Sequence, residues 1–207
     1  MKNLFLIQPS SFLRKLYPHA LWRVDTKEKF IHLTFDDGPI PGLTEWVLDE
    51  LKRNNAKATF FCVGDNILKH PDIFERIKKE GHTVANHTMH HIKGFKNNVK
   101  DYMAETEKCR DLVQTHLFRP PYGQLKRSQY KALKLKGYKI VFWDVISYDY
   151  ETIGEATCLK NSIARTREGS IVVFHDNVKA EKNLRYTLPL FLKHFANLQF
   201  QFKALET

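Results

Sequence analysis

Short apolar runs rich in β-branched and aromatic residues alternate with longer segments of helical periodicity along almost the whole chain. Residues 30–35 form the first such run, and residues 43–52 then place Val47, Leu48 and Leu51 at helical spacing. The expected strands are residues 30–35, 58–63, 82–85, 117–119, 139–143, 170–174 and 200–204, and the expected helices are residues 43–52, a stretch that ends at Gly81, and residues 99–114, 126–136, 155–165 and 184–195. Strands that are apolar on both faces and separated by helices are typical of a parallel sheet, because the helices cover both of its faces.

This alternation predicts the α/β class, with the strands curved into a barrel. A complete eightfold (β/α) barrel usually needs around 250 residues, whereas this chain has 207 residues and about seven expected strands. We therefore expect a distorted or incomplete parallel (β/α) barrel. Residues 1–25, which contain Pro9 and Pro18, are expected to form an N-terminal leader packed on the barrel, and residues 26–207 to form the domain itself.

Cysteine content and hydropathy exclude several classes of protein. Cys62, Cys109 and Cys158 are odd in number and widely spaced, so neither a disulfide framework nor a zinc ribbon is expected. No apolar run approaches the roughly 18 residues that a membrane-spanning helix needs. The apolar run at residues 4–7 is also shorter than the roughly 7–15 residues of a signal-peptide core. These features favour a cytoplasmic or membrane-associated protein.

The chain is basic, with 33 Lys and Arg against 23 Asp and Glu and a net charge of +10. Such a balance favours contact with an anionic surface, such as a cell wall or a membrane. The basic residues are dispersed, however, and no nucleic-acid-binding motif accompanies them. Solvated helix faces therefore explain them better than a nucleic-acid site does, and we expect no nucleic-acid partner.

Polar residues follow the ends of the expected strands. They are Asp36-Asp37-Gly38 after the first strand, His87 to His91 after the third, Arg119 to Gly123 at the end of the fourth, Asp149 shortly after the fifth and His175-Asp176 after the sixth. In a parallel barrel the carboxyl ends of the strands form one rim of loops, where active sites are built. Five polar sets on one rim indicate a catalytic site, although Asp-Asp-Gly alone is also typical of an ordinary turn.

Two histidines of the second set have a spacing that suits a metal ion. On a helix, His87 and His91 would lie one turn apart on the same face and could chelate a single ion. With Asp37 they complete a set of two histidines and one carboxylate that leaves coordination positions open, as catalytic metal sites do. The chain has ten histidines, so a chance pair is the competing interpretation. We expect His82 and His90 to be surface or core residues.

The other polar residues each have a catalytic and a plain interpretation. Asp36 is adjacent to Asp37 and points in another direction, so one carboxylate could bind a metal while the other acts as a base. Arg119, held rigidly before two prolines, would suit the orientation of a carboxylate or be an ordinary surface cation. His175 leaves an apolar strand beside Asp176 and is either catalytic or a hydrogen-bonded loop histidine.

In their order along the chain, these residues resemble the motifs of the polysaccharide deacetylase (NodB-homology) family. The matching segments are Thr34-Phe35-Asp36-Asp37-Gly38-Pro39, His87-Thr88-Met89-His90-His91, Arg119-Pro120-Pro121-Tyr122-Gly123 and Val173-Phe174-His175. The resemblance extends from about residue 30 to the C-terminus. It implies a distorted (β/α) barrel with about seven strands, in agreement with the alternation described above.

The resemblance also implies a role for each residue of the metal centre. Asp37, His87 and His91 would bind one divalent metal ion, most often zinc, with cobalt, iron, manganese or nickel as alternatives. Asp36 would be the general base that deprotonates a metal-activated water. Arg119 would hold Asp36 ionised and correctly oriented.

Further roles that the resemblance implies concern the acyl group and the leaving group. The backbone N–H of Tyr122 would help to stabilise the oxyanion. His175 would be the general acid that protonates the leaving amine, and Asp149 would orient and charge His175. Val173 and Tyr150 would line the substrate pocket, where the family commonly has Leu and Trp.

The function that the resemblance implies is a metal-dependent hydrolase that removes acetyl groups from N-acetylated amino sugars of a glycan, such as peptidoglycan, a chitin-like oligomer or a lipid-linked sugar. An O-deacetylase of an acetylated polysaccharide is an alternative. A catalytically inactive carbohydrate-binding barrel is another, but a structural metal would need neither Asp36 nor His175. Ile146 stands where the family commonly has Asp, a change that concerns substrate identity more than catalysis.

Overall fold

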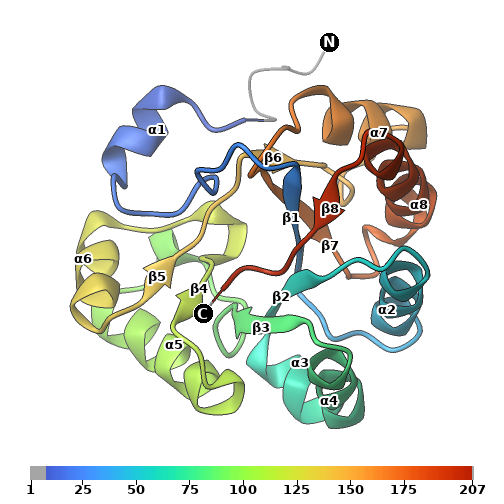
Figure 1. Ribbon diagram of the computed structural model, residues 1–207. Helices are drawn as coiled ribbons and strands as arrows, with labels where there is room; N and C mark the ends of the chain where they lie inside the picture. The colour runs from blue at the N-terminus through green and yellow to red at the C-terminus, as the bar shows by residue number, and fades with distance from the viewer. Residues whose placement is uncertain (1–7, 207) are drawn as a thin grey trace.

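A sheet of short parallel strands curls into an open barrel, and helices surround it (Figure 1). The computed structural model describes residues 8–206. Its strands are β1 (Phe30–Asp36), β2 (Ala58–Cys62), β3 (Thr83–Asn86), β4 (Leu117–Phe118), β5 (Lys139–Ile140), β6 (Val145–Ile146), β7 (Ile171–His175) and β8 (Gln201–Phe202). Their order is β5-β4-β3-β2-β1-β7-β6, with β8 paired to β1, and these pairings are parallel. The predicted distorted parallel (β/α) barrel is therefore confirmed.

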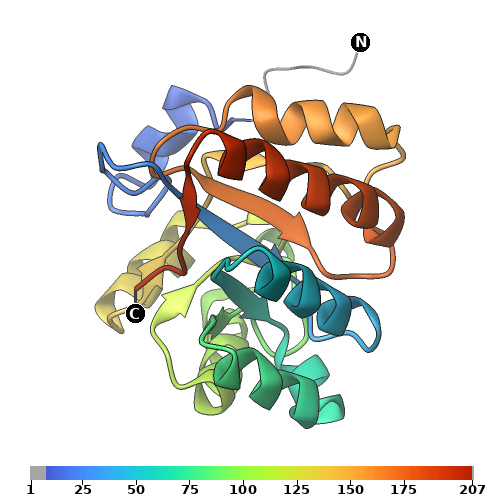
Figure 2. The same ribbon diagram turned by 45° about the vertical axis from the view of Figure 1, so that its right-hand side comes forward.

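Helices connect most of the successive strands, and the first helix precedes β1. They are α1 (Ser11–Leu16), α2 (Leu43–Arg53), α3 (Gly64–Lys69), α4 (Pro71–Lys79), α5 (Val99–Val113), α6 (Arg127–Leu135), α7 (Glu155–Ala164) and α8 (Glu181–Asn197), with short 3₁₀ turns η2 (Gly94–Lys96) and η3 (Pro121–Gly123). Helices α7 and α8 lie side by side over the outer face near β7 (Figure 2). Among residues 8–206, no helix is both long and apolar enough to cross a membrane.

The sequence did not predict α1 or β6, and two of the elements that it did predict are shortened or divided. The strand expected at residues 139–143 ends at Ile140, because the chain there leaves β5 at one edge of the sheet and crosses to β6 at the other edge. The helical stretch expected before Gly81 is divided into α3 and α4 at His70, which has φ −134° and ψ 58°. The residue before a proline avoids the helical conformation, which accounts for this break.

The leader contacts the barrel beside the crossing from β5 to β6. Leu21 forms an isolated parallel bridge with Val141. Trp22 is buried and stacks on Phe142, with ring centroids 4.3 Å apart. Residues 1–7 of the predicted leader lie outside the described residues, and the boundary at residue 25 stays a prediction.

A buried carboxylate also joins the leader to the barrel. Asp144 accepts a hydrogen bond of 2.7 Å from Arg14 of α1 and one of 2.8 Å from Ser170, and Arg167 lies 3.5 Å away. A buried charge is costly unless it is paired and hydrogen-bonded, and these contacts supply its partners. Because Asp144 and Ser170 precede β6 and β7, this cluster lies at the end of the barrel away from the strands' carboxyl ends.

Strand β1 separates the helix-covered core from the barrel interior. Leu33 and Phe35 pack with apolar residues of the surrounding helices, such as Leu48. Thr34 and Asp36 lie on the opposite face, where the Arg119 guanidinium contacts both. The alternation arises because successive side chains of a strand point to opposite faces. It brings Asp36 to the rim from inside the barrel.

Trp22→Ala should lower the free energy of unfolding by about 3–5 kcal/mol, because it removes a stacked ring from a closely packed site. Phe12→Ala is the matched control, since Phe12 also belongs to the leader but is 72% exposed, against 7% for Trp22. Its loss should change the free energy of unfolding by less than about 0.5 kcal/mol. Urea unfolding followed by circular dichroism measures both variants. Equal effects would contradict the packing of the leader described above.

Candidate active site

The predicted site residues converge on one cavity of about 770 Å³ at the carboxyl ends of the strands. The polar residues that line it include Asp36, Asp37, His87, His91, Tyr122 and His175. The apolar and aromatic part of its wall includes Val173, Tyr150, Ile146 and Trp143. Arg119 and Asp149 are fully buried and hydrogen-bond to lining residues from behind.

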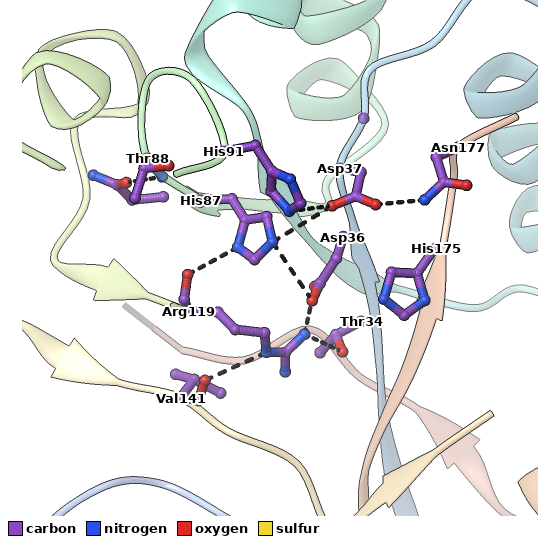
Figure 3. A network of polar contacts seen from close by, with 12 residues as sticks. Thr34, Asp36, Asp37, His87, Thr88, His91, Arg119, Val141, His175 and Asn177 are labelled. Atoms are coloured by element: carbon purple, nitrogen blue, oxygen red, sulfur yellow. Dashed lines mark hydrogen bonds and ion pairs between the residues drawn. The ribbon is translucent and has the colours of Figure 1, made fainter. Parts of the chain in front are cut away.

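Asp37, His87 and His91 form a compact cluster of metal-ligand type (Figure 3), in which one ligand atom from each residue lies within 4.8 Å of the others. Asp37 Oδ1 lies 3.0 Å from His91 Nε2 and 3.5 Å from His87 Nε2. This buried oxygen nevertheless has no hydrogen bond of normal geometry to any described residue. Buried polar atoms are rarely left without a partner, so the cluster fits a divalent cation bound by all three side chains.

The electrostatics of the cluster suit cation binding. Burial would raise the pKa of Asp37, but the neighbouring His87 and His91 imidazoles hold it well below its usual value. Carboxylates bind metal ions in the deprotonated form, so Asp37 has the charge state at neutral pH that a metal ion would need. His87 Nδ1 lies 2.8 Å from the carbonyl oxygen of Arg119. Because a carbonyl only accepts, Nδ1 carries the proton and Nε2 is free to act as a ligand.

Residues 87–91 are not helical, so the prediction that helical spacing aligns the two histidines was wrong. The segment is a loop in which Thr88 and His91 adopt left-handed conformations, with φ of 65° and 52°. The side-chain oxygen of Asn86 accepts a hydrogen bond of 2.9 Å from the Thr88 N–H, and its amide donates to the Thr106 carbonyl at 2.8 Å. An Asn side chain bonded to the following backbone competes with a helix. The imidazoles therefore converge through a turn.

Asp36 lies beside this cluster and is held by a buried arginine. Arg119 Nη1 donates to Asp36 Oδ1 at 2.6 Å and to the hydroxyl of Thr34 at 2.7 Å. Its other nitrogens donate to the backbone carbonyls of Phe142 at 2.9 Å and Val141 at 3.3 Å. A fully buried guanidinium with these acceptors is fixed in position, and it fixes the Asp36 carboxylate in turn.

His175 is paired with Asp149 at the end of β7. The ring Nδ1 lies 2.8 Å from Asp149 Oδ1, and the His175 backbone N–H donates to Asp149 Oδ2, also at 2.8 Å. Burial disfavours the charged imidazolium, but the Asp149 carboxylate outweighs it and raises the pKa of His175 to about 9. His175 is therefore protonated at neutral pH, with Nε2 as the nitrogen available to the cavity.

The Tyr122 loop forms another part of the rim. Tyr122 adopts a left-handed conformation with φ 59°, and its ring lies 4.6 Å from the ring of His91. Gly123 follows with φ 64°, and a Cβ there would lie 2.6 Å from the indole of Trp143. Only glycine allows this close approach, which brings the loop and Trp143 together at the cavity.

The sequence analysis did not predict Asn177 as a site residue, and it named Asp176 without predicting its contacts. The Asn177 amide donates a hydrogen bond to Asp37 Oδ2. Asp176 is buried and accepts a hydrogen bond of 3.1 Å from the Gly38 N–H. Their position just after His175 was a signal for both, but no spacing in the sequence pairs them with residues about 140 positions earlier.

The parallel barrel with this cluster at its rim places the protein among (β/α) barrels that carry a candidate metal centre. Three protein ligands would leave coordination positions open, as in catalytic metal sites. Residues 23–141, more than half of the chain, match the family model described as polysaccharide deacetylase. The chain therefore belongs to the polysaccharide deacetylase family, and the resemblance inferred from its motifs is confirmed.

Individual relatives support this membership. The chain is 35% identical over 151 residues to a peptidoglycan-N-acetylglucosamine deacetylase of Bacillus cereus. The aligned residues cover 70% of this chain and 55% of that protein. The chain thus spans about half the length of that relative. It is 32% identical to a chitooligosaccharide deacetylase of Rhizobium leguminosarum bv. trifolii over 72% of each protein. The crystal structure of the Bc1960 peptidoglycan N-acetylglucosamine deacetylase matches with a TM-score of 0.86 and 29% identity over 94% of both chains.

His87→Ala should weaken zinc binding by more than roughly 100-fold, because it deletes a candidate ligand. Loss of a group that only supports a ligand typically costs roughly 10- to 100-fold. His90→Ala is the matched control, since this neighbouring imidazole pairs with Glu105 at 2.8 Å and is not part of the cluster. Competition with a chromogenic chelator measures both affinities. Equal zinc affinities of the two variants would contradict the ligand set.

Proposed function

We propose that this chain is a metal-dependent hydrolase that removes acetyl groups from N-acetylated amino sugars of a glycan. The observation that carries the proposal is that one cavity collects the cluster of metal-ligand type, the carboxylate bound to Arg119 and the histidine bound to Asp149. Amide hydrolysis needs an activated water, stabilisation of the oxyanion and a proton for a poor leaving group. The three groups together meet these needs.

The cluster would hold one divalent ion, and zinc suits its two imidazole nitrogens and one carboxylate oxygen. When bound, such an ion supplies an activated water and Lewis acidity towards the acetyl carbonyl. Asp36 is the proposed general base. Arg119 donates to Asp36 Oδ1, which leaves Oδ2 to accept the proton, and Oδ2 lies on the His87 side of the carboxylate, 4.0 Å from Nε2.

His175 is the proposed general acid. Asp149 accepts from Nδ1, so the Nε2 proton is the one that the leaving amine can take. The raised pKa of His175 keeps that proton in place at neutral pH. As the proton leaves, the imidazole becomes neutral while Asp149 continues to fix its orientation.

The rest of the cavity would bind the acetyl group. The backbone N–H of Tyr122, in the left-handed turn at the rim, is the proposed donor to the oxyanion. Val173, Tyr150 and Ile146 provide an apolar wall for the acetyl methyl group. Val173 in place of a larger leucine would leave more room in this wall.

The similarity to proteins named peptidoglycan and chitooligosaccharide deacetylases supports a glycan that contains N-acetylglucosamine as the substrate. The net charge of +10 suits approach to an anionic cell-wall or membrane surface. A polymer of N-acetylated sugars at such a surface combines both features. We therefore propose an anionic N-acetylated glycan, with peptidoglycan as the leading candidate.

Asp36→Asn should retain zinc and lose at least about 100-fold in turnover, because it removes the base without changing the size of the side chain. The assay is acetate release from N-acetylglucosamine oligomers, peptidoglycan fragments and acetylated xylan, with zinc and after chelation. Asp111→Asn, at an exposed carboxylate on α5, should behave as the parent. Full activity of Asp36→Asn would refute the base assignment. Release from xylan alone would identify an O-deacetylase instead.

Asp149→Asn should move the alkaline limb of the pH profile of kcat/KM to lower pH. The proposed acid works in its protonated form, so parental activity is present below the pKa of His175, about 9, and is lost as the pH rises through it. Without the Asp149 carboxylate, the main influence that raises the pKa of His175 is gone, and burial opposes only the attraction of Asp37 and Asp36, so the pKa should fall from about 9 towards the ordinary value of 6.5. An alkaline limb that stays where the parent has it would contradict the role of His175. Asp111→Asn again serves as the control.

A further inference from the structure

We infer that Asn177 is a positioning residue that dedicates Asp37 to metal binding through a single oxygen, Oδ1. The inference rests on the proposed metal-dependent function and adds a residue outside the sequence motifs that define the site. The amide nitrogen of Asn177 donates a hydrogen bond to Asp37 Oδ2. Figure 3 shows Asn177 approaching the Asp37 carboxylate from the side away from His91.

The two oxygens of Asp37 have different surroundings. Oδ1 faces the Nε2 atoms of His91 and His87, at 3.0 and 3.5 Å, and has no hydrogen bond of normal geometry to a described residue. Oδ2 accepts the hydrogen bond from Asn177. A carboxylate can bind a cation through one oxygen or through both. An amide donor on Oδ2 leaves Oδ1 as the free ligand atom, so more coordination positions stay open for water and the acetyl carbonyl.

The orientation of the Asn177 amide follows from its second contact. Its side-chain oxygen accepts a hydrogen bond of 3.0 Å from the Ala180 N–H, just before α8. Since a backbone N–H can only donate and a carboxylate oxygen only accepts, the amide oxygen must face Ala180 and the nitrogen must face Asp37. The amide cannot be flipped without losing both bonds. Asn177 therefore acts as a donor to Asp37 in a defined direction.

The loop that carries Asn177 is itself fixed against the loop that carries Asp37. Asp176 accepts a hydrogen bond of 3.1 Å from the Gly38 N–H and one of 2.5 Å from the Thr44 hydroxyl. The contact is close, because a Cβ on Gly38 would lie 2.0 Å from Asp176 Oδ2. These contacts fix the backbone next to Asn177, so the position from which Asn177 donates to Asp37 is also fixed.

The backbone of Asp37 is already held, which leaves the rotation of its carboxylate as the remaining freedom. Its N–H donates to the Phe61 carbonyl at 3.2 Å, and its carbonyl accepts from the Asn66 amide at 2.8 Å. These bonds support a left-handed conformation with φ 85°, which is uncommon for a residue other than glycine. The Asn177 amide holds Oδ2 of this side chain, on the side of the carboxylate opposite His91.

Three variants separate positioning from a merely structural role. Asn177→Ala removes both contacts of the amide. Asn177→Ser keeps a short oxygen that can accept from the Ala180 N–H, but this side chain is too short to replace the donor to Asp37. Val178→Ala is the matched control, because Val178 is in the same loop, is 73% exposed and has an apolar side chain that cannot donate a hydrogen bond to Asp37.

The experiment measures the zinc Kd by chelator competition and the visible absorption spectrum of the cobalt(II) form of each variant. Both Asn177 variants should bind zinc roughly 10- to 100-fold more weakly than the parent, as is typical when the support of a ligand is lost. Their cobalt(II) bands should also weaken, because a freed Oδ2 can join the ion and raise its coordination number. Val178→Ala should match the parent in both measurements.

Parental zinc affinity and spectrum in Asn177→Ser would overturn the inference, since the weakening in Asn177→Ala would then come from the lost contact to α8. Weaker affinity with an unchanged cobalt(II) spectrum in both variants would contradict ligation through a single oxygen. Zinc binding by the parent without acetate release from any glycan would refute the proposed function and leave the inference standing. A parent that binds no zinc would refute both.

Discussion

The buried ion pair between Arg119 and Asp36 is the interaction on which the rest of the site depends. The guanidinium lies inside the barrel and donates to Thr34, Asp36, Val141 and Phe142. A buried guanidinium is tolerated only when acceptors surround it, so these four residues must stay where they are. They come from β1 and from the segment that crosses the open side of the barrel. Polar contacts to one arginine therefore join the segment that leaves β5 to β1 in the middle of the sheet, whereas β5 and β6 lie at opposite edges and are not paired with each other.

The same arginine contacts both Asp36 and a histidine of the neighbouring cluster. Its side chain fixes Asp36, and its backbone carbonyl accepts from Nδ1 of His87, which frees the other imidazole nitrogen for a metal. The adjacent carboxylates Asp36 and Asp37 then differ because of the backbone between them. Asp36 ends a strand and faces the barrel interior, whereas Asp37 takes a left-handed conformation and turns towards the histidines. Two neighbouring residues of one type thereby occupy different environments, as distinct roles require.

The sequence predicted the barrel and the location of the site because both follow from regular geometry. Parallel strands bring their carboxyl ends to one rim whatever the side chains do there, so residues as distant as Asp36 and His175 could be placed together from pattern alone. Contacts that depend on irregular backbone escaped prediction. Asn86 bonds to Thr106 of α5 and turns the histidine segment into a loop, and Asn177 meets Asp37 only through the folded loops. Such contacts have no periodicity, and no spacing in a single sequence pairs the residues that make them.

The proposed base and the proposed acid are held in the same way. Each presents one face to the cavity and has a fully buried partner of opposite charge behind it, Arg119 for Asp36 and Asp149 for His175. A charge held from behind keeps its protonation state and direction without using the atoms that substrate must reach. The partners also exclude water from the rear of each group, which strengthens their electrostatic effect. The rim can therefore hold a carboxylate and a protonated imidazole in one cavity, because the partner behind each group is fixed in the scaffold and independent of the ligand.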